Sequence, residues 1–66
     1  MLKEYDSVVA KKDLGDVPKG TKGVIVIVYP GKRDFEVEFF DAEGNTLCVI
    51  TVNEMDIENR TEDLRI

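Results

Sequence analysis

The sequence predicts a small all-β domain, and two stretches carry that prediction. Gly20 and Gly23 stand three positions apart in a turn that runs directly into six apolar, mostly β-branched residues at 24–29. Such a run is typical of a strand that is buried on much of both faces. Residues 35–39 (Phe-Glu-Val-Glu-Phe) alternate apolar and acidic side chains, which is the period of a strand with one buried face. We expect at least one of the two glycines to have a positive φ or to pack against another backbone.

The other elements follow from strand formers and turn chemistry. Gly15 and Pro18 mark a long loop in which Leu14 and Val17 are the only apolar anchors, and Pro30-Gly31 ends the apolar run. In chain order we expect a strand over 5–10, a loop over 13–22, strands over 24–29 and 35–39, a hairpin loop over 41–45, a strand over 46–52, a helical turn over 53–56 and a closing strand at Ile57. This order predicts a five-stranded, partly open SH3-like barrel over residues 1–58, followed by a C-terminal tail of residues 59–66.

Length and cysteine content limit how the domain is stabilised. A chain of 66 residues forms one domain, and a domain of this size buries only ~60% of its unfolded surface. The single Cys48 excludes an intrachain disulfide, and in its apolar strand we expect it to act as a small buried hydrophobe. The chain shows no signal-peptide pattern and no apolar run near the ~20 residues that span a bilayer. We therefore expect a cytoplasmic protein that does not bind membranes.

Charge is distributed unevenly along the chain. The net charge is −5, from 14 acidic and 9 basic residues, and Arg60 is the only base between residues 34 and 63. The bases cluster instead around the apolar run, at Lys11, Lys12, Lys19, Lys22, Lys32 and Arg33. This asymmetry favours a cationic partner and opposes general attraction to phosphate backbones.

The side chains needed for catalysis are scarce. The chain has no His, which is the usual general base near neutral pH. Residues 41–45 (Asp-Ala-Glu-Gly-Asn) look like part of a calcium loop, but Val52 stands where the bidentate Glu would be needed, so we expect a plain hairpin. Glu36 and Glu38 fit the solvated face of a strand better than a hydrolytic carboxylate pair. We expect no enzymatic activity, no metal and no cofactor.

The strand residues also carry a family resemblance. The chain resembles a family of small bacterial proteins of unknown function with an SH3-like barrel, and the matching segments are 6–9, 13–14, 19–26, 35–39, Asp41 with Gly44, 46–47 and 49–52. A weaker similarity, over residues 19–28, links it to ribosome- and transcription-associated barrels that share the Gly-x-x-Gly-Val pattern. Because the closer family has no established activity, the resemblance implies a fold and no functional residues.

The central strands carry more apolar residues than one thin core can bury. If Val24, Val26 and Val28 face inward, their neighbours point outward, where monomers rarely leave a large apolar patch uncovered. We therefore expect a non-enzymatic interaction module that binds a protein partner, such as a basic protein that it masks, or a second copy of itself. The expected partner-binding residues are Ile25, Ile27, Tyr29, Phe40 and Ile50, bordered by Glu36 and Glu38.

The alternative function is a nucleic-acid-associated barrel in translation or transcription. It would use Lys19, Lys22, Lys32 and Arg33. Against it, the chain has no Trp, and several of its few aromatic residues are expected in the core, so a platform for stacking bases is doubtful. Lysines that flank strands also discourage edge-to-edge aggregation.

Overall fold

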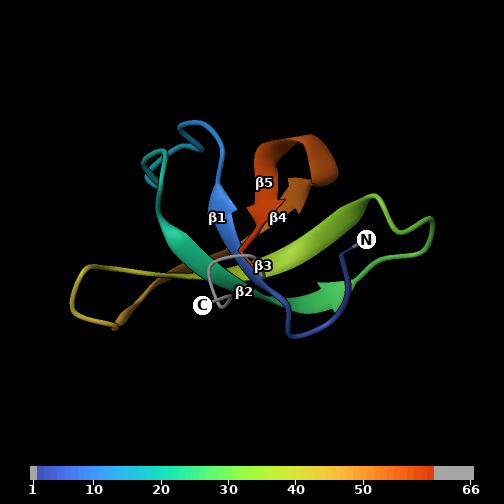
Figure 1. Cartoon of the computed structure of the whole chain (residues 1–66), viewed down its shortest axis with the longest axis horizontal. Coiled ribbons are helices and arrows are strands. Elements are labelled where there is room, and N and C mark those ends of the chain that lie inside the picture. Colours follow the sequence, from blue (N-terminus) through green and yellow to red (C-terminus); the bar gives the residue numbers. More distant parts are fainter. Residues whose placement is uncertain (1, 61–66) are drawn as a thin grey trace.

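The computed structural model describes residues 2–60, which form one five-stranded antiparallel sheet in the order β4-β3-β2-β1-β5 (Figure 1). The elements are β1 (Ser7–Ala10), β2 (Lys22–Val28), β3 (Asp34–Phe40), β4 (Thr46–Asn53), the one-turn 3-10 helix η1 (Glu54–Asp56) and β5 (Ile57–Asn59). The predicted all-β fold class is confirmed. The sheet is consistent with a partly open barrel, because its end strands β4 and β5 do not pair with each other.

The first strand is shorter than its strand-forming residues predict. Tyr5 has a φ of 71° and is 72% exposed, and Asp6 N–H donates to the carbonyl of Lys3 at 3.1 Å. A positive φ at a residue other than glycine belongs to a turn, not to a strand. The expected strand over 5–10 therefore begins only at Ser7.

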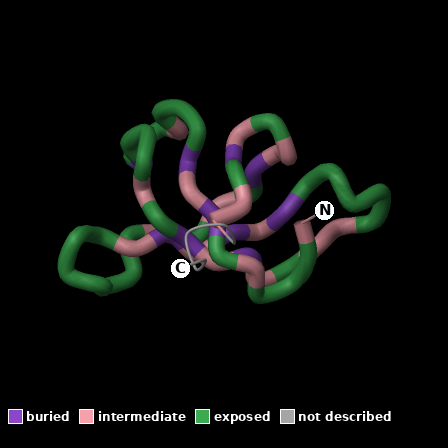
Figure 2. Tube along the Cα trace, viewed as in Figure 1, coloured by how far each residue is buried: buried purple, intermediate pink, exposed green. Residues whose placement is uncertain are grey.

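The core lies on one face of the sheet, where the buried segments gather along the strands (Figure 2). Its members are Val8, Ala10, Val17, Ile25, Phe35, Val37, Phe39, Val52 and Ile57. Val17 reaches this core from the β1–β2 loop, where Leu14 and Val17 form an isolated bridge. The two expected apolar anchors of that loop thus hold it against the open end of the core.

Gly23 determines which face of β2 points inward. A Cβ at Gly23 would lie 2.8 Å from the carbonyl oxygen of Glu38 and 2.9 Å from Phe39 Cδ1, so only glycine fits there. Gly20 lies in open space but has a φ of 92°. Both glycines therefore meet the sequence prediction, Gly20 by its backbone angle and Gly23 by close packing.

The predicted register of β2 was wrong in its first half. Ile25 is fully buried, whereas Val24 is only half-buried. A β-bulge between Ile25 and Ile27 then inserts an extra residue, so that Ile27 is exposed and Val28 packs against the core. Because side chains alternate with a period of two, the bulge reverses the alternation along the strand.

The expected helical turn is confirmed as η1, and it closes the sheet through a capping box. The Asn53 side chain accepts from Met55 N–H, and the Asp56 carboxylate accepts from Asn53 N–H at 2.9 Å. The Lys12 ammonium lies 3.1 Å from the same carboxylate. The Asn53 N–H, and with it Lys12, holds the pKa of Asp56 below its usual value, so the ionised form ties η1 to the β1–β2 loop.

Candidate functional site: the outer face of the sheet

Opposite the core, the central strands β2, β3 and β4 present a second face. We call it the outer face and define it by the residues Val24, Ile27, Tyr29, Glu36, Glu38, Phe40, Val49 and Thr51. Strand register sets its centre: Glu36 pairs with Ile27 on β2 and with Thr51 on β4. Glu38 pairs in the same way with Val24 and Val49. Two carboxylates thus lie in the middle, with apolar and hydroxyl side chains on either side.

Both carboxylates are held by hydroxyl groups. Glu36 Oε1 accepts from Tyr29 OH at 3.0 Å and from Thr51 Oγ1 at 2.6 Å, and Glu38 Oε2 accepts from Thr46 Oγ1 at 2.5 Å. Among the ion pairs of residues 2–60, none uses either glutamate. The two side chains are therefore positioned acceptors that form no ion pair within residues 2–60.

Tyr29 extends this arrangement towards the end of β2. Its hydroxyl donates to Glu36, and this hydrogen bond, with burial and the negative charge of Glu36, raises the pKa of Tyr29 above its ordinary value of 10.0. Ionising the phenol would remove the donor and place a second negative charge beside the carboxylate. Tyr29 therefore remains a neutral donor that orients Glu36.

The apolar part of the outer face is exposed. Ile27 is 44% exposed and Val49 is 48% exposed, on either side of the two carboxylates, and Leu47 is 41% exposed near the start of β4. Sequence reasoning missed Val49 and Leu47. The sequence carried one signal for Val49. Thr51 is a polar residue in the otherwise apolar run of β4, which favours an outward position, and Val49, two residues earlier, lies on the same side of the strand.

Two of the predicted partner-binding residues do not reach the outer face. Ile25 belongs to the core because the first half of β2 has the opposite register to the predicted one. Ile50 packs against the core from the inner side of β4. The structure brings the other five together on the outer face, namely Ile27, Tyr29, Glu36, Glu38 and Phe40. The first three contact or face one another directly, through the Tyr29 hydroxyl and the pairing of Ile27 with Glu36.

A groove adjoins the outer face at Phe40. It lies between the β1–β2 loop and the β3–β4 hairpin and has a volume of about 660 Å³. Its lining combines apolar residues from both sides with charged ones. The apolar residues are Pro18, Phe40, Ala42 and Leu47, and the charged ones include Lys19 and Lys22. A second, shallower hollow shares Lys22 and Phe40 and extends over Val24. The outer face and the groove therefore form one continuous surface.

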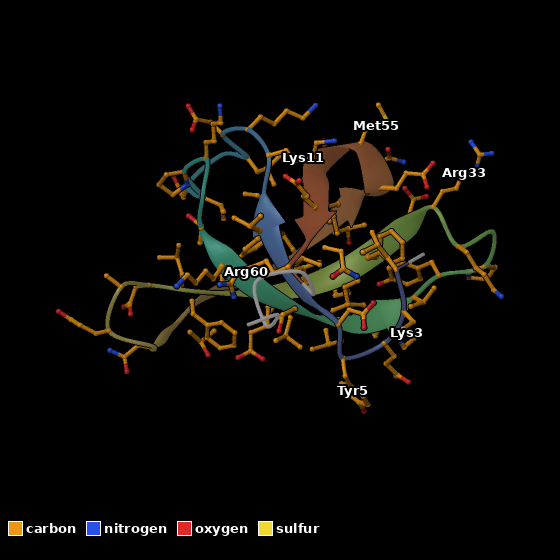
Figure 3. The ribbon with its side chains drawn as sticks, viewed as in Figure 1. Lys3, Tyr5, Lys11, Arg33, Met55 and Arg60 are labelled. Carbon is orange, nitrogen blue, oxygen red and sulfur yellow. The ribbon has the colours of Figure 1, made fainter. Side chains whose placement is uncertain are left out.

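The four basic residues of the nucleic-acid alternative are not brought together. Lys19 lies in the β1–β2 loop and Lys22 begins β2, whereas Lys32 and Arg33 lie in the turn after β2. The two pairs are thus at opposite ends of a strand about 23 Å long. Arg33 Nη1 is 3.9 Å from a carboxylate oxygen of Glu54. Figure 3 shows Arg33 extending away from the sheet. These residues form two separate basic pairs.

Two further kinds of group in residues 2–60 concern metal and thiol chemistry. This part of the chain contains no cluster of three or more His, Cys, Asp or Glu residues placed to hold a metal ion. Cys48 is half-buried and packs against the core. No helix in the same region is long and apolar enough to cross a membrane.

The comparison with known families covers the whole sheet. Residues 4–59 match the model of a domain of unknown function, DUF4926. The chain belongs to this family. The matched region includes all five strands, so the outer face and the groove are parts of the DUF4926 domain itself. The searches of curated proteins and of solved structures found no match.

Proposed function

We propose that this DUF4926 domain is a non-enzymatic binding module whose outer face binds a basic protein. The observation that carries the proposal is the pair of carboxylates at Glu36 and Glu38, which hydroxyl groups hold in place between the exposed side chains of Ile27 and Val49. Positioned carboxylates that form no ion pair within residues 2–60 are acceptors for the ammonium or guanidinium groups of another chain.

The spacing of the carboxylates suggests the form of the partner. Glu36 and Glu38 stand two residues apart on one face of β3, which separates them by about 7 Å. Basic side chains at alternate positions of an extended segment have the same spacing. Such a segment would place one cation on each carboxylate and lay the methylene chains of those basic residues on Ile27 and Val49.

Two properties of the protein favour the binding of a cationic partner at the outer face. The hydroxyl bonds already restrict both glutamate side chains, so less conformational entropy is lost when a partner binds. The net charge of −5 steers cationic partners toward the protein and raises their association rate at low ionic strength. The groove beside Phe40 offers further apolar area to the same partner.

A nucleic-acid partner is the second candidate, and one observation favours it. Lys19 and Lys22 both line the groove. However, Asp16 and Asp41 line the same groove, and the outer face beside it carries Glu38. In the groove the two aspartates offset the two lysines, so it has no net positive charge to attract a phosphate backbone, which favours the protein partner.

Two synthetic peptides of identical composition test the proposal. One carries lysines at alternate positions between valines, and the other carries the same lysines at every third position, so that successive lysines of an extended chain point to opposite faces. We expect calorimetry to show tighter binding of the alternating peptide, and we expect the double variant Glu36→Gln/Glu38→Gln to weaken that binding at least about tenfold.

Glu43→Gln is the matched control, because Glu43 lies in the exposed β3–β4 hairpin and not on the outer face. It should bind the alternating peptide like the wild type. Equal binding of that peptide by the double variant would overturn the proposal, as would absence of peptide binding together with salt-sensitive RNA or DNA binding that needs Lys19 and Lys22.

A further inference from the structure

β4 lies at one edge of the sheet that residues 2–60 form. In residues 2–60 it pairs with β3 alone, and with eight residues it is the longest strand. The other edge, β5, has three residues. A long edge strand presents a row of backbone groups that can pair with another strand.

The hydrogen-bond pattern shows which backbone groups of β4 face the open edge. Glu54 N–H donates to the carbonyl of Arg33 at 2.7 Å, so the pairs bonded between β3 and β4 are Phe35 with Val52, Val37 with Ile50 and Phe39 with Cys48. The intervening residues Val49 and Thr51 therefore direct N–H and C=O away from β3. The edge ends at Asn53, whose N–H is bonded to the Asp56 carboxylate.

The usual protection of an edge strand is missing from this segment. Residues 46–52 (Thr-Leu-Cys-Val-Ile-Thr-Val) contain no charge and no proline, in a chain that is 35% charged. Natural edges are blocked by lysine, proline, bulges or inward-pointing charges. The single irregularity of β4 is the bulge near Phe40, which leaves residues 48–52 regular.

We propose that β4 pairs antiparallel with β4 of a second copy of this chain, about a two-fold axis at Ile50. Val49 then lies opposite Thr51 of the second copy, and Thr51 opposite its Val49, so that both pairs exchange two N–H···O=C bonds. On the inner side, Ile50 lies opposite its own counterpart and joins the two cores.

Charge favours a second copy over a basic partner at this edge. The paired segments carry no charge, so a lysine-bearing strand would gain no ion pair there, whereas two identical segments oppose no like charges. Asp56 caps the edge at Asn53, beyond the paired residues Val49 and Thr51. Glu36 and Glu38 on β3 would lie three strand spacings from those of the other copy. That distance is about 14 Å, beyond the Debye length of about 8 Å at physiological salt.

Amide hydrogen exchange at two protein concentrations tests the pairing residue by residue. In the dilute protein the N–H groups of Val49 and Thr51 should exchange rapidly, while that of Ile50 is protected by β3. At millimolar concentration all three should be protected. Because each copy carries a charge of −5, added salt should strengthen the association.

Two variants, with mass measured by sedimentation, separate this edge from the outer face. Val49→Pro removes an edge N–H without touching a bond to β3, so it should remain folded and weaken the dimer at least about tenfold. Ile27→Ser, on β2, should leave the dimer intact.

The proposal is wrong if the wild type stays monomeric at millimolar concentration, if its dimer leaves the Val49 and Thr51 amides unprotected, or if a basic peptide and not a second copy protects them. If Val49→Pro fails to fold, the exchange experiment decides alone.

Discussion

The two faces of β3 differ in burial and charge, although their residues alternate in one strand. Phe35, Val37 and Phe39 are at most 1% exposed on the inner face, and volume decides what fits there. Glu36 and Glu38 on the outer face contact only hydroxyl groups in the hydrogen bonds of residues 2–60, and their charge remains available. The inner face therefore determines stability, and the outer face can change with little cost to the fold.

The largest effect should come from filling the space that Gly23 leaves on the inner face. Gly23→Val would force carbon atoms against the Glu38 carbonyl oxygen, so we expect a loss of more than about 3 kcal/mol in the free energy of unfolding. Gly44→Ala is the comparison, because Gly44 lies in open space and its φ of 87° alone should cost about 1 kcal/mol. Equal urea stability of the two variants would refute the packing role of Gly23.

A matched pair in β2 measures the difference between the faces directly. Ile25→Ala removes a fully buried side chain and should cost about 2–5 kcal/mol, whereas Ile27→Ala, at a position 44% exposed, should cost less than about 1 kcal/mol. Urea unfolding of both variants provides the comparison. The reverse order would mean that the bulge after Ile25 is misplaced.

A smaller, pH-dependent effect is expected at the capping box. The folded state lowers the pKa of Asp56, so the carboxylate stabilises the fold above the unfolded value of 3.8, and this contribution is lost as the pH falls through the folded pKa. Asp56→Asn should therefore be less stable than the wild type at neutral pH and should approach it in acid. The exposed Asp16→Asn serves as control and should match the wild type at neutral pH. A difference for Asp56→Asn that persists unchanged in acid would exclude the charge as the cause.

The smallest effect should come from the outer-face hydroxyl of Tyr29. Its pKa is raised in the folded protein, so the hydrogen bond to Glu36 contributes below pH 10.0 and is lost as the pH rises through the folded pKa. Ultraviolet titration of Tyr5→Phe, which leaves Tyr29 as the single tyrosine, should show the raised pKa. Adding Glu36→Gln should lower it. If the pKa of Tyr29 did not change on adding Glu36→Gln, the hydrogen bond to Glu36 would not be the cause of the raised pKa.

Sequence alone predicted the faces of β3 but not those of β2 or β4. In β3 Glu36 and Glu38 mark outward positions between buried apolar residues, so the period of two is readable. In β2 every residue from Val24 to Val28 is apolar, and the register depends on a bulge and on the space around Gly23, which are tertiary features. The same ambiguity in β4 hid Val49 and put Ile50 on the wrong face.

The polar part of the outer face was predictable only as a pair of positions. The sequence places Glu36 and Glu38 on one face, but the hydroxyls that hold them come from residues 7, 8 and 15 positions away. These contacts depend on strand pairing, which the local pattern does not specify. The separation of the four basic residues likewise depends on the length and direction of β2, which the local pattern does not specify.

The most direct test of the outer face as a binding surface is an NMR titration with the peptide of alternating lysines and valines. If the account is right, the methyl resonances of Ile27 and Val49 shift together with the amides of Glu36 and Glu38, while those of the buried Ile25 stay in place. Shifts confined to Lys32 and Arg33, or spread evenly over the acidic residues, would contradict it.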